Sequence, residues 1–152
     1  MATTSSVLAD VVGSLQRLLA AGTIRLLAET KPVPAPRPRV MKWGGVFYPK
    51  PYTEFTATLQ QEFAKQRDQA PLDEPLMAAV VVTSERPKST KLHHPRGDCD
   101  NHAKGPLDAI TKTARVWLDD SQIGTLLIHK RWGLPGEPGS VAVHVTPMGV
   151  PA

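Results

Sequence analysis

Near the N-terminus, hydrophobic residues recur at a helical period. Apolar positions between Leu8 and Leu19 are three or four residues apart, which is typical of an amphipathic helix. Gly22 follows at the position where a left-handed residue commonly ends a helix. We therefore expect residues 1–22 to form an appended helix that packs on the rest of the chain or on a second copy of it.

The remaining residues, 23–152, alternate between strand-like and helix-like patterns. The expected elements are a strand at 24–31, a small hairpin at 43–48, a helix at 53–68, a strand at 77–83, a helix within 101–113, and strands at 123–131 and 140–146. The strand at 77–83 is an almost unbroken apolar run, which is typical of a central strand. The order β-α-β-α-β-β predicts an α+β fold, a two-layer domain with a small mixed or antiparallel sheet.

The composition indicates a single folded domain without internal disulfides or a membrane span. The chain has 152 residues, of which 41% are hydrophobic, enough for one ordinary folded domain. A single cysteine excludes an internal disulfide and suits a reducing compartment, so we expect a cytoplasmic location. No apolar run is as long as a membrane span of about 20 residues, so we expect no membrane partner.

Charge is distributed unevenly along the chain, although the net value is only +4. Residues 31–50 and 86–96 contain basic residues and no acidic ones, whereas residues 98–120 contain five aspartates. Cations flanking a small acidic region suit a metal-dependent nuclease, because the cations bind phosphates that the carboxylates would repel without a metal. On charge alone, two solvated loops and an ordinary charged helix explain the pattern as well. The candidate DNA-binding residues are Arg37, Arg39, Lys42, Arg86, Lys88, Arg96 and Lys130.

Candidate chemistry is concentrated in two short segments. Asp98 and Asp100 are two residues apart, so their side chains would share one side of an extended segment. Asp100 can also cap the following helix, and Lys104 would then lie one helical turn further on. After a loop, Asp119 and Asp120 precede the next strand, where they could return to face the first pair.

Several carboxylates around one point would bind a hard cation. Mg²⁺ is the expected ion, because it takes few protein ligands and keeps positions for water and phosphate oxygens. A protonated Lys104 cannot bind the metal, but it can offset negative charge in a phosphoryl transition state. No other small-molecule cofactor is expected.

Several of these residues have a second interpretation. Asp119-Asp120-Ser121 alone is as typical of a turn as of a metal site. Asp108 could face the site or simply pair with a lysine on the helix surface. Cys99 and His102 lack zinc-ligand spacing, so we expect Cys99 in the core and His102 at the surface. Gly105-Pro106 predicts either a kink or a helix that begins only at Pro106.

The combined motifs resemble a known family. The segment Asp98-Cys99-Asp100-Asn101, Lys104, and Trp117-Leu118-Asp119-Asp120-Ser121-Gln122-Ile123 is similar to the signature of the RusA-like Holliday junction resolvases, a family common in phages and prophages. The upstream Pro- and Arg-rich segment, residues 31–39, also resembles that family. The resemblance extends from about residue 24 to the C-terminus.

The resemblance implies a homodimeric, Mg²⁺-dependent endonuclease that cuts four-way DNA junctions by paired symmetric nicks. It assigns essential acidic roles to Asp98, Asp100 and Asp120, a catalytic role to Lys104, and a less firm metal-binding role to Asp119. Two alternatives stay open: a nuclease acting on other branched DNA, such as flaps and forks, and a catalytically silent DNA-binding dimer.

Overall fold

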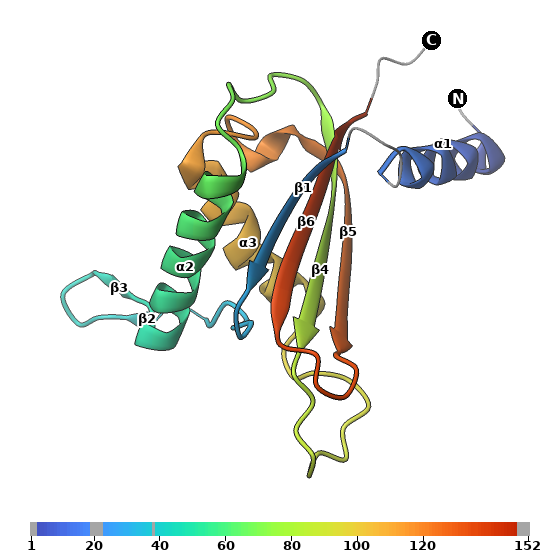
Figure 1. Cartoon of the computed structure of the whole chain (residues 1–152). Coiled ribbons are helices and arrows are strands. Elements are labelled where there is room, and N and C mark those ends of the chain that lie inside the picture. The colour runs from blue at the N-terminus through green and yellow to red at the C-terminus, as the bar shows by residue number, and fades with distance from the viewer. Residues whose placement is uncertain (1–2, 19–22, 38, 149–152) are drawn as a thin grey trace.

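The structure, a computed structural model, describes residues 3–18, 23–37 and 39–148 (Figure 1). Its elements are α1 (Thr4–Leu18), β1 (Ile24–Glu29), β2 (Arg39–Val40), β3 (Val46–Phe47), α2 (Lys50–Gln66), β4 (Leu76–Ser84), α3 (Cys99–Thr113), the short 3-10 helix η1 (Asp120–Gln122), β5 (Ile123–Trp132) and β6 (Ser140–Pro147). The predicted α+β class and element order are confirmed. The predicted small hairpin is formed by β2 and β3 and begins at Arg39, before its predicted start at residue 43.

Four strands form one mixed sheet in the order β1-β6-β4-β5. Strand β6 pairs antiparallel with both β1 and β4, whereas β4 and β5 are parallel. Helix α3 is the crossover between the two parallel strands. Strand β4 is central, as its apolar run predicted, and α2 and α3 cover one face of the sheet (Figure 1).

The core lies between that sheet face and the two helices. Helix α2 buries side chains at three- and four-residue steps, namely Tyr52, Phe55, Leu59 and Phe63. They pack against alternate residues of the sheet, including Leu26, Val80, Val82, Val141 and Val143. Burying each large apolar side chain contributes roughly 1.5–3 kcal/mol, so this layer accounts for much of the stability.

Helix α2 begins at Lys50, three residues before its predicted start. Pro51 lies in its first turn, where backbone amides have no partner within the helix and a proline is tolerated. The predicted start at Thr53 was therefore wrong, because the first turn of the helix accommodates Pro51.

Helix α1 lies on the other side of the sheet (Figure 1). Its buried Leu18 packs with Met77 and Ala79 of β4. The predicted end at Gly22 lies outside the described residues, and the division into residues 1–22 and 23–152 stays a prediction. In the part of the chain that the structure describes, no helix is long and apolar enough to span a membrane.

The sheet contains a histidine whose titration should affect stability. Burial lowers the pKa of His144, and Arg25 on the paired strand lowers it further. The unfolded chain then takes up a proton near pH 6.5, before the folded chain does, so stability falls as the pH decreases through that value.

We expect His144→Gln to weaken this loss of stability. Urea unfolding of both proteins at about pH 7.5 and about pH 5.5 measures it, because histidines ordinarily titrate between those values and the other four histidines are the same in both proteins. An identical decrease in the free energy of unfolding in both proteins would contradict this assignment.

Candidate active site on helix α3

Four charged residues of α3 lie at four-residue steps and therefore share one face of the helix. They are Asp100, Lys104, Asp108 and Lys112, here called the α3 stripe. The lysines and Asp100 are exposed, and Asp108 is partly buried. The opposite face, which includes Ala103, Ala109 and Ile110, is buried in the core. Packing of α3 thus turns an alternating row of acids and bases outward.

Close packing of α2 on α3 fixes the position of the stripe. A Cβ atom at Gly105 would lie 3.3 Å from Phe55 Cε1 and 3.3 Å from Tyr52 Cε2. The absence of a side chain at Gly105 therefore allows the two helices to approach. Helix α3 is continuous across Pro106, so the alternative in which it begins at Pro106 is wrong. Lys104 consequently lies one turn after Asp100, as expected for a helical segment.

Asp108 lines a small pocket of about 210 Å³ between α2 and α3. The residues lining this pocket are Tyr48, Tyr52, Thr53, Thr56, Lys104, Asp108 and Lys112. Burial raises the pKa of Asp108, Lys104 and Lys112 oppose that shift, and the charge of Asp120 adds to it. Burial, followed by the charge of Asp108, also raises the pKa of Tyr52. Asp108 thus lies within the stripe, between its two lysines, and Asp120 is near enough to raise the pKa of Asp108.

Tyr48 and Tyr52, which line this pocket, were not predicted as site residues from the sequence. Tyr52 is buried between the helices, and the rings of Tyr48 and Tyr52 are 5.8 Å apart. The available signal was weak: the predicted helix start at Thr53 placed Tyr52 outside the helix.

The first acidic pair is arranged differently from the expectation. Asp98 has extended backbone at the position just before α3, whereas Asp100 lies inside the first turn. The argument from an extended segment was therefore wrong for Asp100. The expected cap was also wrong, because Asp98 occupies the cap position and its side chain makes no capping hydrogen bond. Carboxylates at this end of a helix are stabilised by the helix dipole.

The second acidic pair lies in a tightly held turn. The Asp119 carboxylate accepts a hydrogen bond from the Ser121 amide at 3.3 Å, and hydrogen bonds from Ser121 lower the pKa of Asp119. Gln122 Oε1 accepts from the amides of Leu118 and Asp119, and its Nε2 donates to the carbonyls of Leu72 and Glu74. The turn interpretation thus describes Asp119, whereas the charge of Asp120 raises the pKa of Asp108.

Packing beneath the turn depends on Trp117. Its side chain is fully buried, and its indole Nε1 donates to Thr111 Oγ1 at 2.8 Å. This bond joins the turn to the last part of α3. Trp117 therefore has a structural role beneath the turn.

The described residues contain no group of three or more His, Cys, Asp or Glu side chains placed to hold a metal ion. Along the axis of α3, Asp100 and Asp108 are separated by about 12 Å at 1.5 Å per residue. Asp98 and Asp100 therefore lie at one end of the stripe, and Asp120 lies beside its middle. Among the described residues of one chain, these carboxylates do not surround a common metal position. The oxygen-donor type of these carboxylates nevertheless suits Mg²⁺, which commonly takes one or two carboxylates plus substrate phosphates.

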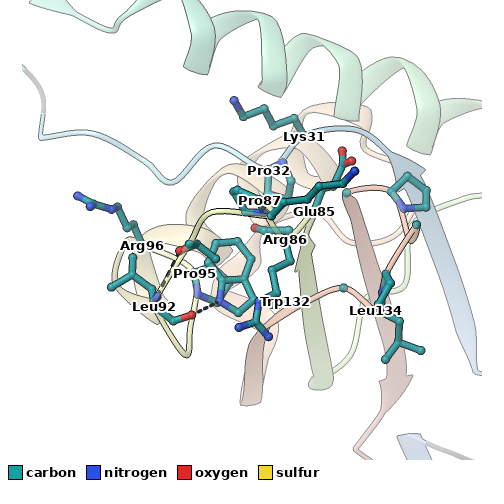
Figure 2. A pocket seen from close by; sticks show the side chains of 18 of the residues that line it. Lys31, Pro32, Glu85, Arg86, Pro87, Leu92, Pro95, Arg96, Trp132 and Leu134 are labelled. Carbon is teal, nitrogen blue, oxygen red and sulfur yellow. Dashed lines mark hydrogen bonds between the residues drawn. The ribbon is translucent and has the colours of Figure 1, made fainter.

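A second hollow, the basic cleft, lies at the end of the sheet where β1, β4 and β5 finish (Figure 2). Its cations are Lys31, Arg86, Lys88, Lys91 and Arg96, and its acids are Glu29 and Glu85. The loop between β4 and α3 supplies most of this charge. Three predicted DNA-binding residues, Arg86, Lys88 and Arg96, are thus brought together on one surface.

The remaining predicted DNA-binding residues lie elsewhere. Arg37 and Lys42 are exposed between β1 and α2, and Arg39 begins β2. The Lys130 ammonium instead donates to the carbonyls of Pro95, at 2.9 Å, and Gly97. Lys130 therefore holds the loop that leads into Asp98 and Asp100.

His102 also makes a hydrogen bond to this loop. It is buried, with 3% of its surface exposed, so its expected surface position was wrong. Its Nε2 lies 2.7 Å from the Arg96 carbonyl, which can only accept, so Nε2 donates. Gly97 has a positive φ of 93°, and a Cβ atom there would lie 2.9 Å from His102 Nε2. The expectation that Cys99 points into the core was also wrong, because it is exposed.

Comparison with known proteins identifies the family. The family model described as endodeoxyribonuclease RusA matches residues 29–145, which cover most of the chain. The chain belongs to this family. No curated protein matches the chain.

We expect Lys130→Met to destabilise the protein by about 1–3 kcal/mol, because two carbonyls lose a charged donor. Lys130→Arg should retain part of that stability. Lys91→Met, in the basic cleft, is the control for loss of charge alone. Urea unfolding of the variants measures the difference, and equal effects at positions 91 and 130 would contradict the role given to Lys130.

Proposed function

We propose that this member of the RusA endodeoxyribonuclease family resolves four-way DNA junctions by hydrolysing phosphodiester bonds at the α3 stripe. The observation that carries the proposal is the outward row of Asp100, Lys104 and Asp108, with Asp120 beside it. The family description supports DNA cleavage. Preference for the four-way junction follows from the motif resemblance.

Binding of branched DNA is assigned to two basic surfaces. One is the basic cleft, next to the loop that carries Asp98, and the other is the acid-free segment 31–50. Lysine and arginine contacts to phosphates position DNA without reading its sequence. DNA bound by the second surface would reach the α3 stripe, because Tyr48 of segment 31–50 lines the same pocket as Lys104 and Asp108.

The chemistry is divided between carboxylates and a lysine. Asp98, Asp100 and Asp120 would supply carboxylate oxygens to Mg²⁺, one or two to an ion whose other ligands are DNA phosphate oxygens and water. Asp119 contributes mainly by capping its turn. When bound, the ion supplies Lewis-acid activation of the phosphate and of water. The Lys104 ammonium lies on the same helix face and stabilises negative charge that develops on the phosphate.

A homodimer is part of the proposal. A junction needs two equivalent nicks, and a two-fold axis supplies two equivalent sites. The sites of the two subunits would then face strands of the same polarity.

We expect Asp100→Asn to reduce single-turnover junction cleavage in Mg²⁺ by at least about 100-fold, with binding changed only slightly. Asp68→Asn removes an exposed carboxylate outside the site and is the matched control. Cleavage of labelled four-way junctions, flaps, forks and linear duplex measures both activity and substrate preference. Normal cutting by Asp100→Asn would overturn the site assignment.

The substrate and mechanism are tested by the same assay. Wild-type protein should cut the four-way junction fastest, and only with the divalent ion. Faster cutting of flaps or forks would replace the proposed substrate. Tight binding without any metal-dependent nick would favour the silent DNA-binding alternative.

A further inference from the structure

The hairpin formed by β2 and β3 exposes an unusual number of apolar side chains. The hairpin arm, residues 39–48, extends beyond the N-terminal end of α2 (Figure 1). Its exposed large apolar residues are Val40, Met41, Trp43, Val46, Phe47 and Tyr48. Trp43 is 90% exposed, the highest value among the exposed large hydrophobic residues that the structure describes.

The arm has a defined shape although little covers it. Strands β2 and β3 pair with each other in a two-stranded sheet of their own. The Met41 amide donates to the Gly45 carbonyl at 2.7 Å, and Gly44, with a φ of 84°, allows the turn. Because an exposed apolar group of this kind is uncommon on a monomer, it indicates a surface that a partner covers.

Charge indicates the chemistry of that partner. Lys42 adjoins Trp43, and the whole segment 31–50 contains five basic residues and no acidic one. An apolar protein surface needs no such excess of positive charge. A nucleic acid whose bases are unstacked fits both features, since aromatic rings stack on any base and cations hold the adjacent phosphates.

The arm is also joined to the candidate active site. Tyr48, at its end, packs 5.8 Å from Tyr52, measured between ring centroids. Tyr48 and Tyr52 line the same pocket as Lys104 and Asp108. A base held by the arm would therefore lie on a surface continuous with the α3 stripe.

We infer that the hairpin arm is a base-stacking element, in which Trp43 stacks on an unstacked base at the branch point of DNA. This inference rests on the proposed function, because the unstacked base at a branch point lies beside the phosphate that is proposed to be cleaved. The arm would distinguish branched DNA from a continuous duplex, whose bases stay stacked on each other.

We expect Trp43→Ala to weaken binding of a four-way junction by about 5- to 150-fold, the range for loss of one stacked base. Binding of a linear duplex of matched length should change by less than about threefold, because its affinity comes from phosphate contacts. Trp43→Phe, which keeps an aromatic ring, should retain most junction affinity. Leu127→Ala, at an exposed apolar residue of β5, is the control.

Two further measurements keep the inference open to refutation. A 2-aminopurine base at the branch should change its fluorescence on binding wild-type protein and not on binding Trp43→Ala. Unchanged junction affinity, or equal losses on junction and duplex, would overturn the inference. A lower molar mass for Trp43→Ala in light scattering would instead assign the arm to contact between copies of the chain.

The outcome for wild-type protein separates this inference from the proposed function. If wild-type protein cuts junctions and Trp43→Ala binds them normally, only the stacking role fails. If wild-type protein neither prefers nor cuts junctions, the proposed function fails, and the stacking role fails with it.

Discussion

The contact between α2 and α3 at Gly105 is the constraint on which the candidate site depends. Because Gly105 has no side chain, Tyr52 and Phe55 of α2 can pack directly on α3. That packing orients α3 so that its apolar face is buried and the α3 stripe faces outward. A change in the separation or rotation of these helices would move Lys104 relative to both acidic segments at once.

Sheet and helices were largely predictable because their signals are local. The apolar run at 77–83 indicated a central strand, and a helix was expected over 53–68; both elements were confirmed. The geometry of the site was less predictable. The buried position of His102 depends on a hydrogen bond to the Arg96 carbonyl and on close packing against Gly97, which hydrophobic periodicity does not reveal.

Residue type alone does not show that a charge has a structural partner. Lys130 is predicted to contact DNA. In the folded chain its ammonium is bound by backbone carbonyls before α3. Gln122 shows the converse, since an uncharged residue in the acidic motif makes four hydrogen bonds that shape the turn at Asp119. The motif thus combines residues proposed for chemistry with residues that position them.

The claim that the outward face of α3 carries the chemistry is tested most directly at Lys104. The measurement is the single-turnover rate of junction cleavage by Lys104→Met, with enzyme in excess so that all of the DNA is bound. The rate should fall by about 100- to 1000-fold, with junction affinity changed only a few-fold. A normal rate at saturation, with weakened affinity alone, would make Lys104 a phosphate contact and contradict the claim.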